Sequence, residues 1–207
     1  PSAVDDHGYV TEVGLNTTGE ALDWLAQLFY DRKPRRDDFA RIEHAAAAAS
    51  PGADGLLFAP VLGDGERDDP TRRGIASGLS LRHDRSAWAR ATLEGVAFGV
   101  RARLETLERA SAKATELRVS GGGARIALWN QIKADVTGTP VVYVPGDSTA
   151  AGTAMLAGLG AGIYRDVDEA VAKMYRPGPV AEPDPRHRGL YDDMYARYLA
   201  LTGSKEG

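Results

Sequence analysis

The sequence contains no cysteine, which excludes disulfide bonds, thiol catalysis and thiolate metal sites. It also has no excess of basic residues: 25 Lys and Arg stand against 29 Asp and Glu, and the formal net charge is -4. Nothing therefore draws the chain electrostatically to nucleic acid or to an anionic membrane. No apolar run approaches the roughly 20 residues of a membrane-spanning helix, and the first ten residues lack the basic region and apolar core of a secretory signal. We expect a soluble, cytoplasmic protein with neither nucleic acid nor membrane as a partner.

Metal-ligand spacing is also missing from the sequence. The histidines have no carboxylate or cysteine at a spacing that suggests a metal site; they are His7, His44, His83 and His187. We interpret all four as surface or incidental residues. The sequence therefore predicts no metal-binding residue in this chain.

What the sequence does contain is an alternation of helical and extended patterns. Hydrophobic residues make up 43% of the 207, enough for the core of one domain. Strands are predicted at residues 7–13, 117–119 and 139–144. Helices are predicted at about 17–30 with Asn16 or Thr17 as the cap, and at 37–49, 86–110, 148–159, 166–174 and 189–201. This alternation predicts an α/β fold with long helices.

The segment 117–135 carries the most specific local signal. A short apolar strand leads directly into Gly121, Gly122 and Gly123, and an amphipathic helix follows. Glycines at a helix start let a ligand approach the backbone closely, and the positive end of the helix favours a phosphate. A strand, a glycine turn and a helix also form an ordinary α/β connection. Taken alone, this segment fits a structural turn and a nucleotide site equally well.

Five segments together form a more specific pattern. In chain order they are 18–25 (TGEALDWL), 57–67 (LFAPVLGDGER), 74–95 (GIASGLSLRHDRSAWARATLEG), 121–135 (GGGARIALWNQIKAD) and 147–154 (DSTAAGTA). They resemble, in the same order, the motifs of the C-terminal, ATP-binding lobe of the FGGY carbohydrate kinases, and in particular its xylulokinase-like members.

The resemblance implies a fold and a reaction. The fold is a ribonuclease-H-like lobe of the actin-like ATPase superfamily, with a mixed sheet flanked by long helices and incomplete at its N-terminal strands. Residues 1–207 would form the ATP-binding lobe, while the sugar-binding lobe and the catalytic aspartate would lie outside this chain. The reaction is transfer of the γ-phosphoryl group of ATP to a sugar hydroxyl, with a xylulose-like pentulose as the expected substrate. ATP and Mg²⁺ are the implied cofactors, with the Mg²⁺ ligands mostly outside this chain. The chain alone is expected to be inactive.

The resemblance also implies which residues meet the nucleotide. They are Gly19, Asp23, Gly121, Gly122, Gly123, Ala124, Ile126 and Asp147. The glycines and Ala124 would contact adenosine, and Gly19 would lie near the phosphates. Ile126 stands where relatives often carry a small or polar residue. Asp147 fits a helix N-cap as well as a ligand contact. No catalytic residue is assigned.

Four other residues have structural interpretations. Arg90 and Glu94 lie one helical turn apart and are expected to form an i,i+4 ion pair. Thr149 and Gly152 are expected to pack the helix at 148–159 against the glycine turn.

Two alternatives belong to other functional classes. One is a nucleotide-binding module without kinase activity on the same fold. The other is a structural fragment that forms a homodimer through an exposed sheet edge. For dimerisation, the residues expected to be exposed are the apolar run 56–62 and the strand at 7–13.

Overall fold

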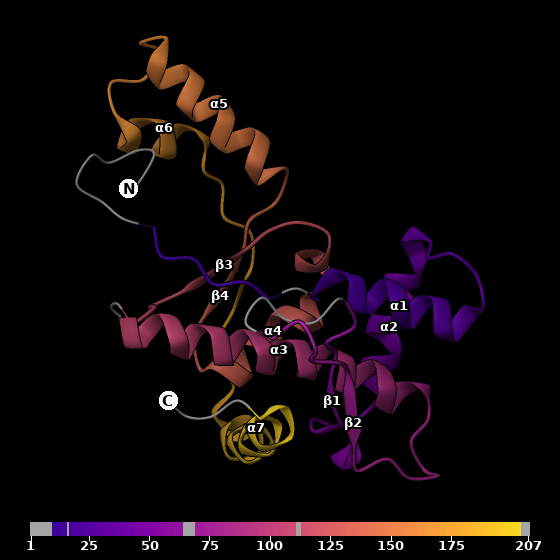
Figure 1. Ribbon diagram of the computed structural model, residues 1–207. Coiled ribbons are helices and arrows are strands. Elements are labelled where there is room, and N and C mark those ends of the chain that lie inside the picture. Colours follow the sequence, from indigo (N-terminus) through magenta and orange to yellow (C-terminus); the bar gives the residue numbers. More distant parts are fainter. Residues whose placement is uncertain (1–9, 16, 64–68, 111–112, 204–207) are drawn as a thin grey trace.

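The computed structural model describes residues 10–15, 17–63, 69–110 and 113–203, and its architecture is α/β (Figure 1). In chain order the helices and strands are α1 (Gly19–Tyr30), α2 (Arg36–Ala48), β1 (Leu57–Ala59), β2 (Ile75–Ser77), α3 (Arg85–Ala110), β3 (Leu117–Val119), α4 (Ala127–Thr137), β4 (Val141–Tyr143), α5 (Ser148–Gly160), α6 (Val167–Met174), β5 (Val180–Ala181) and α7 (Arg188–Thr202). Each predicted helix is confirmed, with ends within two residues of those expected.

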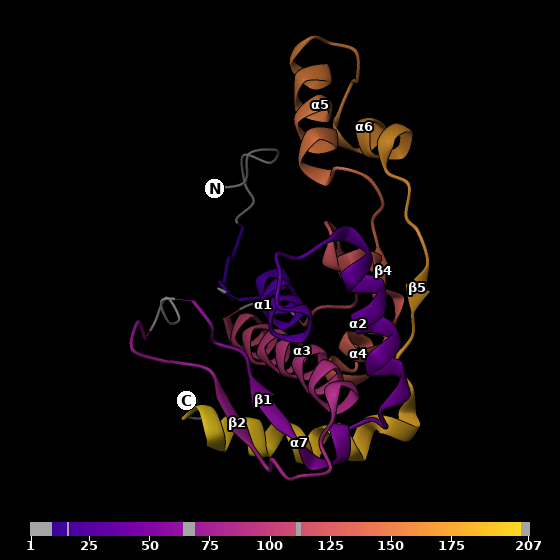
Figure 2. The same ribbon diagram turned by 90° about the vertical axis from the view of Figure 1, so that its right-hand side faces the viewer.

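The strands form a mixed sheet and a separate hairpin. In the sheet, β4 lies between β3 and β5; β3 is parallel to β4 and β5 is antiparallel to it. The hairpin pairs β1 with β2 in antiparallel fashion. Figure 2 shows the hairpin beside α7 at one end of the molecule, with α5 and α6 at the other. The mixed sheet and long helices implied by the resemblance are therefore present.

The strand predicted at residues 7–13 is wrong where the structure describes it. Residues 10–13 are not part of a strand, and Val10 is 73% exposed; residues 7–9 lie outside the described part. β-Branched residues favour extended backbone, but a strand also needs a neighbour to pair with. The N-cap residue of α1 is Thr18 rather than Thr17, and Asn16 lies outside the described residues. The Thr17 hydroxyl instead accepts a hydrogen bond from the Leu62 backbone N–H over 3.3 Å.

The apolar run 56–62 is not exposed, so this expectation was also wrong. Its first six residues are buried, and β1 lies within it. The ring of Phe58 packs 5.6 Å from Trp24 of α1 and 5.5 Å from Trp88 of α3, measured between centroids. The run is therefore a core strand that joins two helices, and it leaves no apolar face for a second copy.

Helix α3 forms the centre of the core. Nearly all of its residues from 87 to 99 are buried, and it packs against α2, α4 and β1. The closest approach is at Gly95, where a Cβ atom would overlap the carbonyl oxygen of Phe58 in β1. The glycine at this position is therefore required by packing, because the strand crosses the helix at backbone distance.

We expect Gly95→Ala to lower the free energy of unfolding by about 1–3 kcal/mol, the usual cost of forcing atoms into a full core. Urea denaturation measures the loss. The matched control is Gly152→Ala in α5, where a Cβ would meet no atom within 4 Å. Alanine should stabilise that helix by roughly 0.5–1 kcal/mol. Equal stability of the Gly95→Ala variant and the unaltered chain would show that β1 can move away without cost.

A buried polar network ties α3 to α7. Arg90 Nε donates to Glu94 Oε1 over 2.7 Å, so the expected i,i+4 pair is confirmed. The same oxygen accepts the Gly52 backbone N–H over 2.9 Å and the Tyr191 hydroxyl over 2.9 Å. Burial raises the pKa of Glu94, while Arg90 beside it acts in the opposite direction. The pair is therefore a structural junction in the core and not part of a solvated helix face.

His187 is another residue whose expected role was wrong. Its Nδ1 lies 2.8 Å from Oδ2 of the buried Asp135. The other carboxylate oxygen of Asp135 accepts hydrogen bonds from the Gln131 side chain and the Asp184 backbone N–H. His187 is therefore no incidental surface residue: with Asp184 it fixes the segment before α7 onto α4.

Helices α5 and α6 form an arm that projects from the rest of the molecule (Figures 1 and 2). They pack mainly against each other. Thr149 is exposed, and a Cβ at Gly152 would meet nothing within 4 Å. The prediction that these residues pack the helix against the glycine turn was wrong, because α5 leaves the body at its first turn. A hydrogen bond from Ser148 Oγ to Ser120 Oγ, 2.9 Å long, joins its start to the end of β3.

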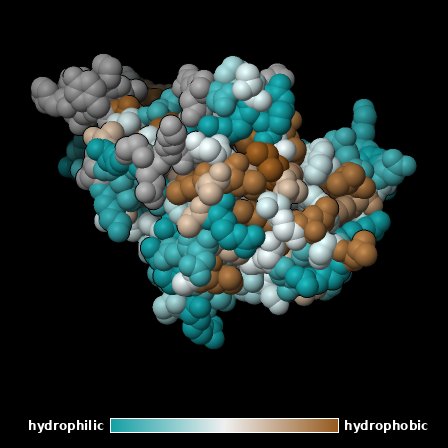
Figure 3. Space-filling model, turned by 60° about the horizontal axis from the view of Figure 1, so that its bottom comes forward, coloured by the Kyte–Doolittle hydropathy of each residue, from teal (hydrophilic) through white to brown (hydrophobic). Residues whose placement is uncertain are grey.

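The surface gives no single large apolar face in the view of Figure 3, where apolar patches alternate with polar ones. Exposed apolar side chains among the described residues include Leu79, Leu81 and Ile163. Within the described part of the chain, no helix has the length and apolarity to cross a membrane. The homodimer stays a prediction, without the 56–62 run as its contact.

Candidate functional site

The glycine turn is built by its backbone conformation and by α4. β3 ends one residue before Ser120, and Gly121 then takes φ +87°, which favours glycine. Gly122 has right-handed helical angles, φ -62° and ψ -48°, and a 3-10 turn at Gly123–Arg125 leads to Ile126 and α4. The strand therefore turns sharply into the helix, as the sequence predicts.

Two side chains of α4 hold this turn in place. A Cβ at Gly123 would lie 2.6 Å from Cζ3 of Trp129, so the turn rests directly on the indole. Trp129 Nε1 donates to the carbonyl of Leu93 in α3 over 3.0 Å. Asn130 Nδ2 donates to the carbonyl of Ala124 over 2.7 Å. The turn is thus fixed to both central helices.

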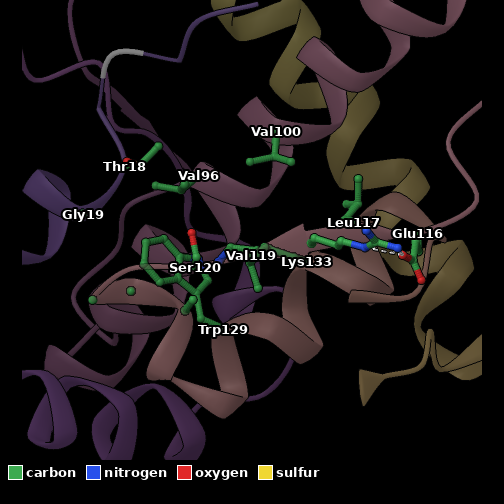
Figure 4. Close-up of a pocket in the computed structure, with 14 residues that line it drawn as sticks. Thr18, Gly19, Val96, Val100, Glu116, Leu117, Val119, Ser120, Trp129 and Lys133 are labelled. Atoms are coloured by element: carbon green, nitrogen blue, oxygen red, sulfur yellow. Dashed lines mark hydrogen bonds and ion pairs between the residues drawn. The ribbon is translucent and has the colours of Figure 1, made fainter. Parts of the chain in front are cut away.

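A cavity of about 550 Å³ opens beside the turn, between α1, α3, β3 and α4. Figure 4 shows Trp129 and Lys133 from α4 on one side and Val96 and Val100 from α3 on the other. Its lining consists of Thr18, Gly19, Val96, Val100, Glu116, Leu117, Arg118, Val119, Ser120, Gly122, Gly123, Ala124, Trp129 and Lys133. The walls are mostly apolar.

A second cavity of about 210 Å³ adjoins the first and shares three glycines with it, Gly19, Gly122 and Gly123. Its other lining residues are Leu22, Asp23, Phe39 and Ile126. It is therefore an apolar recess with one carboxylate, reached across bare glycine backbone.

The structure brings six of the eight predicted nucleotide residues to these two cavities: Gly19, Asp23, Gly122, Gly123, Ala124 and Ile126. Gly121 lines neither, and its contribution is the conformation of the turn. Asp147 lines neither as well: its Oδ1 accepts the Ala150 backbone N–H over 2.9 Å as the N-cap of α5. Of the two interpretations of Asp147, the helix cap is the one that the structure contains.

Charge in the larger cavity is sparse. Glu116 and Arg118 form an ion pair with each other at the exposed end of β3. Lys133 is only 8% exposed, and its Nζ lies 4.2 Å from the centroid of the Trp129 ring. Burial lowers the pKa of the Lys133 ammonium to about 8. Lys133 is not among the predicted nucleotide residues, although its i,i+4 spacing from Trp129 places both on one helix face.

The lining of the two cavities is better suited to binding a ligand than to catalysing a reaction. An apolar recess with a nearby carboxylate can take a flat heterocycle and orient its polar edge, and the glycines permit close approach. A buried cation in the adjoining cavity suits an anionic group. Among the described residues that line the larger cavity, the carboxylate is that of Glu116, and its ion pair with Arg118 makes it a poor general base.

Comparison with known proteins gives consistent matches. The family model described as the FGGY family of carbohydrate kinases, C-terminal domain, matches residues 1–161 of this chain. The chain is 30% identical over 203 residues to the xylulose kinase of Staphylococcus epidermidis, covering 96% of this chain and 40% of that protein. It is 37% identical over 174 residues to the glycerol kinase of Gloeobacter violaceus, covering 80% of this chain and 33% of that protein.

A solved structure agrees with these matches. The xylulose kinase from Rhodospirillum rubrum is similar with a TM-score of 0.81 and 34% identity, over 90% of this chain and 38% of that one. The fold implied by the resemblance is thereby confirmed. The chain spans about 40% of the length of the xylulose kinase relative and less of the others.

Proposed function

Because this chain belongs to the FGGY family of carbohydrate kinases, we propose that it is the ATP-binding lobe of an enzyme that phosphorylates a sugar. The observation that carries the proposal is the pair of adjoining cavities at the glycine turn, which six of the eight residues named from the sequence line together. The sugar-binding lobe and the catalytic base would belong to a part of the protein outside residues 1–207.

In this proposal the smaller cavity takes adenine. Leu22, Phe39 and Ile126 supply apolar surface for the ring, and Asp23 supplies an acceptor for an amino or hydroxyl group. The backbone at Gly122 and Gly123 lies against the ribose, and a side chain at Gly122 would intrude on that space. These residues bind and orient the nucleotide, and the reactive phosphoryl group points away from them toward the sugar.

The acceptor is proposed to be a xylulose-like pentulose. Support comes from the xylulose kinases of Staphylococcus epidermidis and Rhodospirillum rubrum, to which the chain is similar over almost its full length. Similarity to glycerol kinases makes a polyol the competing acceptor. Mg²⁺ would supply charge neutralisation at the phosphates, with most of its ligands outside this chain. An ATP-dependent reaction of this kind also fits a cytoplasmic location.

Two measurements test the proposal. Calorimetry of the purified chain should show weak ADP binding, because half of a cleft buries less of the ligand than a closed one. A coupled assay of ADP release by the full-length gene product should respond to xylulose more strongly than to glycerol. The chain alone should release none, since losing base catalysis costs ~10²–10⁴-fold and losing substrate positioning adds a further large factor.

The outcomes separate the alternatives. ADP binding without sugar-dependent ADP release by the full-length protein would indicate a non-catalytic nucleotide-binding module. Absence of ADP binding by both proteins would reject the nucleotide site itself. Sugar phosphorylation by the isolated chain at ordinary kinase rates would show that the base lies within residues 1–207.

A further inference from the structure

Lys133 is a buried cation without an anionic partner in the described part of the chain. It lies on α4, one turn after Trp129, and lines the larger cavity. Of the other described residues that line this cavity, only Glu116 and Arg118 carry charge, and they pair with each other. The residues contributed by α1 and α3 are uncharged. The Lys133 ammonium therefore faces an apolar cavity, and the ring of Trp129 is the group that partly offsets its positive charge.

The positive charge of the buried Lys133 ammonium is not balanced by a negative charge among the described residues of the cavity. A buried ammonium loses hydration, and the face of an aromatic ring compensates for only part of that loss. Desolvation lowers the pKa of Lys133 to about 8, so a fraction of the amine is neutral near that pH. An anion that enters the cavity would restore the charged form.

The indole of Trp129 connects this cation to the glycine turn. One edge of the ring supports Gly123, and Nζ of Lys133 lies 4.2 Å from the ring centroid. The smaller cavity opens into the larger one across Gly19, Gly122 and Gly123. A nucleotide whose base occupies the smaller cavity therefore has its phosphates directed to the side on which Lys133 lies.

We propose that Lys133 recognises the phosphate groups of the nucleotide and sets the preference for ADP over adenosine. This inference rests on the proposed function, because it assumes that the base occupies the smaller cavity. Lys133 would act as a binding residue and not in proton transfer to the sugar. A phosphate beside the ammonium stabilises its charged form, so binding near pH 8 should take up a proton. ADP affinity should fall as the pH rises through 8, while adenosine affinity should not.

The test is calorimetry of the complete 207-residue chain with ADP and with adenosine at pH 8, in two buffers of different ionisation enthalpy. Lys133→Met keeps the length and apolar stem of the side chain. It should weaken ADP binding by ~10–100-fold, which corresponds to the loss of one hydrogen bond to a charged group. It should leave adenosine affinity within about twofold of that of the unaltered chain. Proton uptake with ADP, seen as a buffer-dependent enthalpy, should disappear. Lys133→Arg should retain the preference for ADP.

Arg125→Gln is the matched control, because it removes one positive charge from the turn that precedes α4, at an exposed residue that lines neither cavity. It should leave the ratio of ADP to adenosine affinity unchanged. An unchanged ratio in Lys133→Met, or proton uptake that persists in it, would overturn the role of Lys133 while leaving nucleotide binding standing. Failure of the unaltered chain to bind either ligand would overturn both. Thermal unfolding of each variant identifies any loss that comes from misfolding.

Discussion

Gly122→Val is expected to abolish ADP binding while the chain remains folded. Gly122 has ordinary helical backbone angles, so valine can adopt its conformation without left-handed strain. A Cβ there would meet no protein atom within 4 Å, so the valine side chain would occupy space shared by both cavities. The nucleotide and the isopropyl group would compete for one volume. Calorimetry at high ADP concentration should detect no binding.

The control for this variant is Gly152→Val, which also adds a side chain at an open helical position but lines neither cavity. It should bind ADP as the unaltered chain does. Thermal unfolding should be similar for the two variants, which separates steric block from loss of structure. Undiminished ADP binding by Gly122→Val would mean that the nucleotide lies elsewhere.

Glu94→Ala should have the largest effect on stability. The Glu94 carboxylate accepts hydrogen bonds from Arg90, Tyr191 and the Gly52 backbone N–H, and its removal leaves the buried Arg90 guanidinium without its anion. Breaking a buried ion pair by removing one partner costs about 3–5 kcal/mol. The free energy of unfolding in urea measures the loss.

Glu169→Ala in α6 provides a matched comparison. Glu169 has two basic partners, Arg165 and Lys173, where Glu94 has one, but the side chains of both partners are exposed. Ion pairs between exposed side chains contribute little to stability, because water and salt screen them. A Glu94→Ala variant that is no less stable than Glu169→Ala would show that the junction between α3 and α7 is held by apolar packing alone.

The helices and the glycine turn could be predicted because their signals are local. Helix α3 repeats Leu93, Val96 and Val100 at helical spacing, and Gly121 stands where the chain must take a positive φ. The motif order identified six residues that the structure brings to the two cavities. These features depend on periodicity and on turn chemistry, both of which can be seen within a few residues.

Other features could not be predicted because they depend on partners distant in the sequence. Glu94 meets Tyr191, 97 residues away, and Asp135 meets His187 across 52 residues. The burial of Phe58 depends on two tryptophans from different helices. No sequence pattern marks Lys133 as a ligand-binding residue, and its environment follows only from the packing of β3, α3 and α4. An apolar run or a charged residue does not reveal by itself which surface will cover it.

The contact at Gly95 has a mechanical consequence. With no side chain between helix and strand, α3 and β1 have no compressible layer between them, and a displacement of one must carry the other with it. Val96, the next residue, forms part of the wall of the larger cavity. The hairpin of β1 and β2 and the wall of that cavity thus belong to one stiff unit. A force applied to the hairpin would reach the cavity wall without passing through a flexible joint.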